Sequence, residues 1–240
     1  MGTRAILRRL LRGVLATMDS AHRPPPASPL LLGEVDLLSQ PRNAAVEAMA
    51  LDRLDAVVFD TETTGLNPAT DAIVQVAGVG LRKGRLDGAE VFDALVDPGR
   101  PIPPANTRIH GIDDAAVAGQ PSIARVAADF HGFVRGRLLV AHNAAFDLAF
   151  LHRAQDRAGV RFDHPVIDTV LLSALVYGPG AGHSLDALCA RLGILIPPHE
   201  RHTALGDTRA TARALLALVQ ALQARGLRTL GDVHEALRAL

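Results

Sequence analysis

The sequence predicts an α/β fold in which a mixed β-sheet is flanked by helices. From residue 54 onward, strand patterns come first and then alternate with helical patterns. The turn signals Lys83-Gly84 and Asp87-Gly88 separate two neighbouring strand patterns and favour an antiparallel hairpin. The length of 240 residues, with 48% hydrophobic residues, allows one domain with a full core plus an appendage.

The first predicted strand contains Val57, Val58 and Phe59, whose side chains suit a packed, pleated surface. If it runs on to Glu62, Asp60 and Glu62 project from one face, because alternate side chains of a strand share a face. Four more runs complete the predicted sheet, at residues 72–81, 89–96, 137–141 and 166–169.

The predicted helices follow capping residues or strands. Ser122 is the expected N-cap of a helix that runs to about Val134, and Ser184 the N-cap of a helix over 185–192. Further helical patterns cover residues 144–158, 204–224 and 227–240. The proline-rich residues 97–104 are predicted to form a loop.

The chain before residue 54 is predicted to be an extension of the compact domain. Residues 1–18 form a basic amphipathic pattern, explained most simply by a helix packed on the domain or a frayed end. A partner, a membrane surface, nucleic acid or a transit-peptide role are the alternatives. Residues 22–29 resemble a polyproline linker. We therefore expect an N-terminal extension over 1–53, a main domain over 54–226 and a C-terminal helix over 227–240.

The composition limits the classes of function. The formal net charge is zero, which argues against a broad basic grip on nucleic acid but allows an enzyme that holds a few nucleotides through metal ions. Aromatic residues make up only 3%, so a platform of stacked bases is not expected. The single cysteine, Cys189, lies in an apolar pattern and cannot form an internal disulfide, and no apolar run could span a bilayer. These features favour a cytoplasmic protein with no membrane span.

Acidic residues at strand ends and helix starts are the candidate catalytic groups. Asp60 and Glu62 follow the first buried run, and such neighbouring carboxylates raise each other's pKa unless a cation lies between them. Asp147 and Asp207 each open a helix, where an acid is also favoured by the helix dipole alone. Taken alone, Asp60 and Glu62 are better explained by a polar turn after the strand, and the case for chemistry depends on the downstream acids.

The four carboxylates together are what a two-metal phosphoryl-transfer site needs. Ligands that are all oxygen favour Mg²⁺ or Mn²⁺, two ions in such a site, and no Cys/His cluster suggests zinc. Hydrolysis also needs a proton acceptor, and His202 suits that role because its ordinary pKa lies near neutrality. Residues five apart on an ideal helix diverge, so His202 must precede the helix to share a site with Asp207.

Three motifs carry a resemblance to a known family: Asp60-Thr-Glu62-Thr-Thr-Gly, His142-Asn-Ala-Ala-Phe-Asp147 and His202-Thr-Ala-Leu-Gly-Asp207. In this order, with His110-Gly111-Ile112 after the first, they resemble the exonuclease motifs of the DEDDh 3′–5′ exonucleases, especially the epsilon proofreading subunits of bacterial DNA polymerase III. The resemblance covers roughly residues 54–225. It implies an RNase H-like fold with a five-stranded mixed sheet, two Mg²⁺ or Mn²⁺ ions, and release of nucleoside 5′-monophosphates.

The resemblance also implies roles by position. Asp60, Glu62, Asp147 and Asp207 resemble the catalytic metal ligands, and His202 the general base. Residues that resemble the binding site for the terminal nucleotide are Thr61, Leu66, Ile109 and His110, together with Asn143. Thr203 stands where a related branch has tyrosine, which favours the histidine branch. Ala105 replaces an acid that some relatives place near the sugar, so the resemblance indicates no choice of sugar.

Several other polar residues receive a structural expectation. Asp168 is expected to support the fold, and Phe146 to lie in the core beneath the site. The histidines that match no motif are expected at the surface or in loops: His131, His152, His164, His183 and His199.

The expected function is metal-dependent 3′–5′ exonuclease activity on the 3′ end of single-stranded or frayed nucleic acid, with DNA favoured over RNA. One alternative is a non-catalytic RNase H-like module that docks a polymerase or another partner; the intact set of four acids and a histidine argues against it. A second alternative is an exonuclease for RNA or short oligonucleotides. A DNA polymerase or another replication or repair protein is a further expected partner. The short C-terminal region favours a stand-alone or differently recruited enzyme, with the first 50 residues as the docking device.

Overall fold

The computed structural model describes residues 43–240. The basic amphipathic pattern and the proline-rich linker predicted for the start of the chain therefore lie outside the described residues. The expected division at residues 53/54 and 226/227 stays a prediction. No helix among residues 43–240 combines the length and apolar character needed to cross a bilayer.

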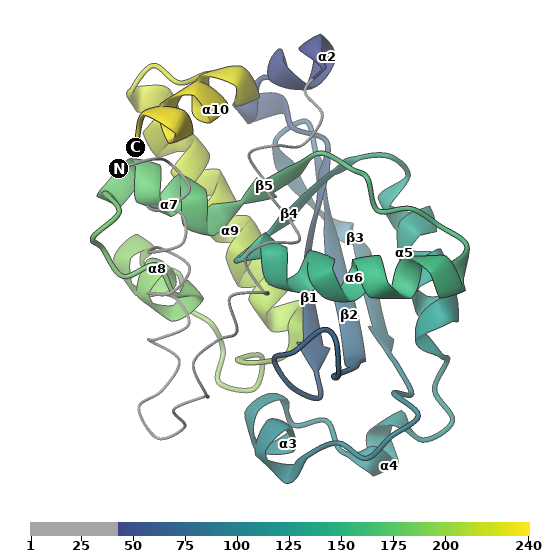
Figure 1. Cartoon of the computed structure of the whole chain (residues 1–240). Coiled ribbons are helices and arrows are strands. Elements are labelled where there is room, and N and C mark those ends of the chain that lie inside the picture. The colour runs from purple at the N-terminus through teal and green to yellow at the C-terminus, as the bar shows by residue number, and fades with distance from the viewer. Residues whose placement is uncertain (1–42) are drawn as a thin grey trace.

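A five-stranded mixed sheet forms the centre of the molecule (Figure 1). Its order is β3-β2-β1-β4-β5, with β1 antiparallel to β2 and parallel to β4. The predicted fold class is confirmed. The strands are β1 (Ala56–Thr63), β2 (Ile73–Arg82), β3 (Arg85–Leu95), β4 (Leu138–Ala141) and β5 (Val166–Asp168).

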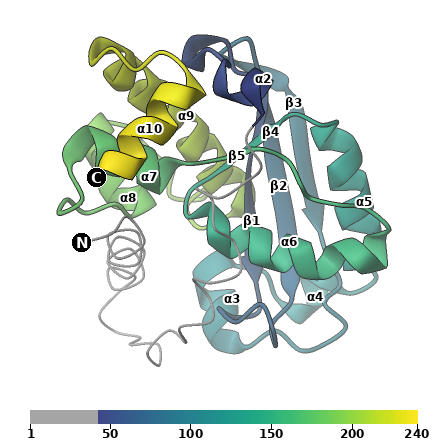
Figure 2. The same ribbon diagram turned by 45° about the horizontal axis from the view of Figure 1, so that its top comes forward.

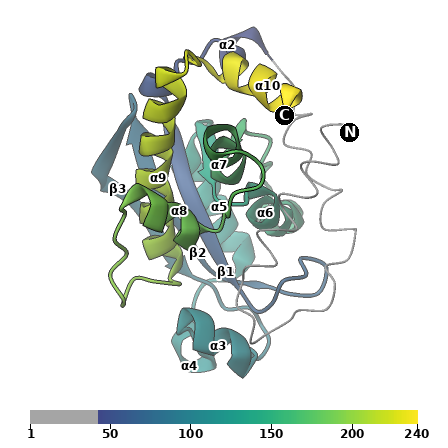
Figure 3. The same ribbon diagram turned by 90° about the vertical axis from the view of Figure 1, so that its left-hand side faces the viewer.

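Alternate residues of β1 face two different hydrophobic cores. Val57 and Phe59 pack in the core shared with α5 (Ile123–Val134) and α6 (Ala144–Ala158). Ala56 and Val58 pack in the core on the opposite face, which includes side chains of α7 (Thr169–Tyr177) and α9 (Ala204–Ala224). Figure 3 shows α9 on one side of the sheet and α5 and α6 on the other. The central strand is thus sandwiched between helices, with its polar end left for the site.

Several short elements pack together at one end of the face of the sheet that α9 covers (Figure 2). The C-terminal helix α10 (Leu230–Ala239) packs against α7 and α2 (Ala44–Glu47), and His234 pairs with Glu47 at 2.9 Å. The 3₁₀ helix η2 (Leu51–Arg53) follows α2, and α8 (Leu185–Leu192) packs on α9. Leu51 and Leu230 are both in the α9-side core, so segments on both sides of the main domain bury apolar surface against it.

Some elements differ from the sequence-based predictions. The predicted loop over 97–104 ends at residue 103. The helices α3 (Pro104–His110) and α4 (Asp114–Val117) follow it and were not predicted, because both are too short to give a periodic pattern. The nine residues of α7 escaped prediction because they are apolar nearly all round, which hides a helical period. The strand β3 begins at Arg85 rather than Ala89, so Lys83-Gly84 makes the turn and Asp87-Gly88 does not.

Candidate active site

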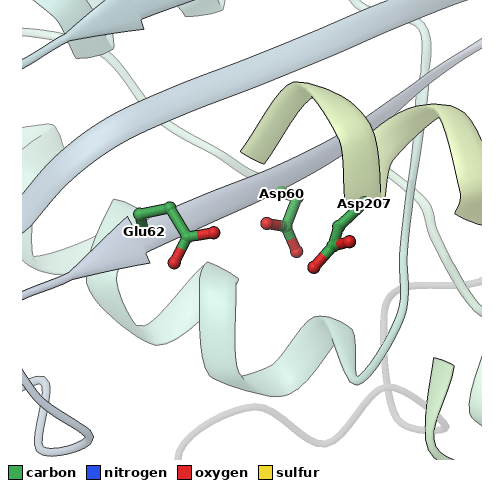
Figure 4. Close-up of side chains that lie close together, drawn as sticks. All are labelled: Asp60, Glu62 and Asp207. Carbon is green, nitrogen blue, oxygen red and sulfur yellow. The ribbon is translucent and has the colours of Figure 1, made fainter. Parts of the chain in front are cut away.

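Three carboxylates meet where β1 passes the first turn of α9. Asp60 and Glu62 share the α9-facing side of β1 because they are two residues apart. Asp207 lies one turn into α9. One carboxylate oxygen from each of the three lies within 4.8 Å of the others, and Figure 4 shows the groups directed toward a common space. This brings together residues that are 147 positions apart in the chain.

Asp147 approaches the cluster from the other side of β1, at the first turn of α6. Its Oδ1 accepts hydrogen bonds from the Thr61 backbone N–H at 3.0 Å and from the Thr61 hydroxyl at 2.6 Å. Thr61 lies between Asp60 and Glu62 in the chain, so one strand residue fixes the fourth carboxylate beside the other two. Thr61 therefore has a structural partner in addition to its predicted contact with a nucleotide.

The surroundings of the four acids disfavour negative charge on their carboxyl groups. Burial raises the pKa of Asp60 well above its usual range, and repulsion from Asp147, Glu62 and Asp207 raises it further. Burial, then Asp207 and Asp147, does the same to the pKa of Glu62. Burial raises the pKa of Asp147 to about 7 although the Thr61 hydrogen bonds oppose it, and burial raises the pKa of Asp207 to about 6. A bound cation would relieve this repulsion, and four oxygen-donating carboxylates suit a hard divalent ion.

His202 lies in the turn before α9, which begins at Ala204. This is the placement that its spacing from Asp207 requires. The side chain is exposed, and the backbone has a positive φ of 58°. Both the imidazole and the backbone of His202 oppose the rise in the pKa of Asp207, so the two residues are close enough to interact.

Asp168 supports the fold as expected, at the start of the helix that carries Asp147. Its buried carboxylate accepts backbone N–H bonds from Asn143 at 3.0 Å and Ala144 at 3.1 Å, at the start of α6, and from Val170 at 2.9 Å in α7. Asn143 occupies the N-cap position of α6, but its side chain makes no capping hydrogen bond and its φ is 67°. The cap comes from 25 residues away, and the Val166-Ile-Asp-Thr sequence gives no local sign of that.

The residues predicted to hold a nucleotide differ in exposure. Leu66 and Ile109 are 40% and 55% exposed. His110 is buried; its Nδ1 accepts the Ile112 N–H at 3.1 Å, and burial lowers its pKa against the opposing influence of the Thr63 backbone. The nucleotide-binding roles of these residues stay predictions.

Two of the unmatched histidines expected at the surface or in loops, His164 and His183, do lie in loops, but their side chains are buried. His183 is buried, with its ring bonded to Ser173 at 2.8 Å and to the Gly178 carbonyl at 3.1 Å. His164 is buried against Phe162. A single sequence does not distinguish a buried histidine that is bonded to distant residues from a histidine that is exposed to solvent.

A five-stranded mixed sheet with carboxylates from β1, α6 and α9 gathered beside its central strand is the arrangement expected of an RNase H-like nuclease. The chain belongs to the exonuclease family, whose RNase T profile, described as Exonuclease, matches residues 57–215. The match includes all three acidic motifs.

Two relatives show how the domain occurs in longer proteins. The chain is 57% identical over 206 residues to a DNA polymerase III subunit epsilon-like protein of Rhodobacter capsulatus, which covers 85% of this chain and 29% of that protein. It is 34% identical over 181 residues to the PolC-type DNA polymerase III of Bacillus subtilis, covering 75% of this chain and 12% of that protein. The chain thus spans less than a third of the length of either relative.

Solved structures give the same fold. Exonuclease X in complex with 5′ overhanging duplex DNA has a TM-score of 0.55 and 28% sequence identity, covering 76% of this chain and 99% of that one. E. coli exonuclease I in complex with a dT13 oligonucleotide has a TM-score of 0.61 over 72% of this chain and 43% of that one; its 18% identity is evidence for the fold alone.

Proposed function

We propose that the chain is a metal-dependent 3′–5′ exonuclease of the DEDDh type that removes nucleoside 5′-monophosphates from a single-stranded or frayed 3′ end. The observation that carries the proposal is the convergence of Asp60, Glu62 and Asp207 within 4.8 Å, with Asp147 acting electrostatically on the first two. A purely structural role does not explain this cluster, because mutually repelling acids destabilise a fold in the absence of a cation.

Asp60, Glu62, Asp147 and Asp207 are the residues that would hold divalent ions. Their donors are all oxygen, which suits Mg²⁺ or Mn²⁺. When bound, a pair of ions would supply positive charge to the attacking and leaving oxygens of the phosphodiester. Asp60 is the central residue of this set, since the other three acids all raise its pKa.

His202 is the candidate general base. It would take a proton from the attacking water while the water oxygen forms a bond to the terminal phosphorus. The bond from phosphorus to the 3′-oxygen of the penultimate nucleotide breaks, and that oxygen takes a proton from solvent. The products are a nucleoside 5′-monophosphate and a chain shortened by one nucleotide with a free 3′-hydroxyl. Exposure of the imidazole lets it return its proton to solvent after each turnover.

DNA is the favoured substrate, and a DNA polymerase a candidate partner. The names of the relatives, an epsilon-like subunit and a PolC-type polymerase, and an exonuclease X–DNA complex support this choice. The exposed side chains of Leu66 and Ile109 offer apolar surface for the terminal base. The net charge of zero predicts a shallow dependence of binding on salt, because few phosphates would be neutralised by side chains.

The test is digestion of matched DNA and RNA oligomers labelled to report release of the 3′ nucleotide, with Mg²⁺, with Mn²⁺ and with EDTA. We expect DNA hydrolysis that depends on the metal and falls about 10³-fold or more in Asp60→Ala, because the loss of a ligand removes several kcal/mol of transition-state stabilisation. A circular dichroism spectrum like that of the wild type would show that the variant is folded. Release of 5′-mononucleotide at the wild-type rate by Asp60→Ala would refute the proposed site, and preference for RNA would refute the proposed substrate.

A further inference from the structure

The turn that carries His202 is folded tightly onto the start of α9. The Glu200 and Arg201 N–H groups donate to the Pro197 carbonyl at 2.9 and 3.2 Å, and the Thr203 N–H donates to the Glu200 carbonyl at 3.2 Å. The Thr203 hydroxyl donates to the same carbonyl at 2.8 Å. His202 lies inside this turn with its positive φ, so its direction is set by the turn.

Gly206 is the point at which the turn touches the helix. A Cβ placed on Gly206 would lie 1.9 Å from the Glu200 carbonyl oxygen and 2.7 Å from the carbonyl carbon. Both are backbone atoms, so they cannot move aside by a change of rotamer. Gly206 is helical and has no positive φ, and glycine in a helix is less favourable than alanine. The close approach of the turn is therefore what requires glycine at this position.

Three side chains make hydrogen bonds that hold the turn against the start of α9. The Thr203 hydroxyl accepts the Gly206 N–H at 3.1 Å, and Gln75 Oε1 accepts the Ala204 N–H at 3.3 Å. Gln75 reaches α9 from β2, directly opposite Glu62 in the antiparallel pair. Arg209, one turn further along α9, donates to the Glu200 carboxylate at 3.1 Å. The turn is thus held by the strand next to the acidic cluster and by the helix that supplies Asp207.

We propose that Gly206 is a positioning residue for His202: its missing side chain lets the 200–203 turn lie on α9 and hold the imidazole beside the acidic cluster. This inference rests on the proposed role of His202 in hydrolysis. An added methyl group at position 206 pushes the Glu200 carbonyl outward, and His202, two residues on, moves with it. Asp207 stays on the helix, so metal binding and nucleotide binding are kept while proton transfer is impaired.

The test compares Gly206→Ala with Gly132→Ala, a matched substitution in α5 where a Cβ would meet no atom within 4 Å. We expect kcat of Gly206→Ala to fall about 10²-fold, the loss typical of a misplaced reacting group, with KM changed less than about 3-fold. The rise in Tm caused by Mg²⁺ should match that of the wild type in both variants. Gly132→Ala should keep the wild-type kcat.

A double-mutant cycle with His202→Ala separates positioning from a general loss of structure. If Gly206 acts through His202, adding Gly206→Ala to His202→Ala changes kcat little further. A p-nitrophenyl ester of a nucleoside 5′-monophosphate keeps the residual rates measurable, because its leaving group needs no proton. Wild-type kcat in Gly206→Ala, a similar fold-loss in both backgrounds, or loss of the Mg²⁺-induced rise in Tm would overturn the inference. Wild-type kcat in His202→Ala would instead refute the proposed role of His202.

Discussion

At the scale of single residues, Asp60 shows most clearly that a group placed for function can lower the stability of the fold. Burial and three neighbouring acids raise its pKa in the folded state, so the folded protein holds this proton more tightly than the unfolded chain does. Stability from this group is therefore present at low pH and is lost as pH rises toward the folded pKa. Without metal, an ionised Asp60 destabilises the fold.

We expect Asp60→Asn to be more stable than the wild type at pH 8 in EDTA and yet inactive. The amide keeps the size of the side chain but removes its charge, and each kcal/mol gained raises Tm by about 2–4 °C in a protein of this size. Thermal denaturation followed by circular dichroism measures the change. A Tm below that of the wild type would show that the carboxylate is already stabilised by the protein alone.

The Thr61 hydroxyl gives a second prediction at this scale. Thr61→Val keeps the shape of the side chain and the backbone N–H bond to Asp147 but removes the 2.6 Å hydroxyl bond. Hydrogen bonds to charged groups contribute about 1.5–3 kcal/mol, so we expect about a 10-fold or greater rise in the Mg²⁺ concentration that gives half-maximal activity. Thr63→Val is the matched control, because the Thr63 hydroxyl donates to the Gly65 carbonyl and not to a carboxylate. Equal Mg²⁺ requirements in the two variants would contradict the role given to Thr61.

At the scale of secondary-structure elements, the start of α6 depends on an acid from another part of the chain. Asp168 accepts three backbone N–H bonds and joins the first turns of α6 and α7. The first turn of α6 also carries Asp147. The orientation of the Asp147 side chain toward the other three acids therefore depends on the helix cap that Asp168 supplies from the end of β5.

Asp168→Ala should destabilise the protein strongly, since it leaves three buried donors without their acceptor. We expect a loss of about 3 kcal/mol or more, with Asp168→Asn in between because it keeps one acceptor oxygen. The matched control is Asp113→Ala, which removes an exposed N-cap at α4 and should cost about 1 kcal/mol. Urea denaturation measures the free energy of unfolding of all three variants. Equal losses for Asp168→Ala and Asp113→Ala would contradict the capping role given to Asp168.

The same element shows what local sequence can and cannot predict. The bounds of α6 agree with the prediction, because a helical pattern ends at Gly159, which adopts the left-handed conformation of a helix C-cap. The capping partner was not predictable, because Asn143 is a common capping residue while the true acceptor lies at the end of the neighbouring strand β5. The helix α7 was missed for a related reason: packing on all sides removes the polar face that periodicity needs.

At the scale of the whole molecule, the sheet order is what turns three sequence motifs into one site. The first motif lies on central β1, the second follows its parallel neighbour β4, and the third opens α9, which packs on β1 and β2. Motif spacing identified the four acids as a set but not their relative positions. Alternation along β1 predicts that Asp60 and Glu62 share one face and Thr61 the other. Which helix covers each face, α9 beside Asp60 and Glu62 and α6 beside Thr61, depends on the topology, which the motifs do not specify.

The balance of buried acids and buried histidines predicts how stability depends on pH. Burial lowers the pKa of His142 to about 4 and also lowers the pKa of His110, His164 and His183, so these groups make stability rise with pH up to about 6.5. The raised pKa values of the acids make stability fall as pH rises, and the pKa of Asp147 reaches about 7. As pH rises past 6.5 the histidines become neutral in the unfolded chain as well, and the acids increasingly decide the slope.

We therefore expect the Tm in EDTA to fall between pH 6.5 and pH 8 as the acidic cluster ionises without a counter-charge. Saturating Mg²⁺ should remove most of this fall, since a cation takes the place of the retained protons. The rise in Tm caused by Mg²⁺ should thus be larger at pH 8 than at pH 6.5 in the wild type, and smaller and flatter in Asp60→Asn. Differential scanning calorimetry at both pH values measures it. A Mg²⁺-induced rise that is the same at the two pH values would mean that the four carboxylates do not bind the ion together.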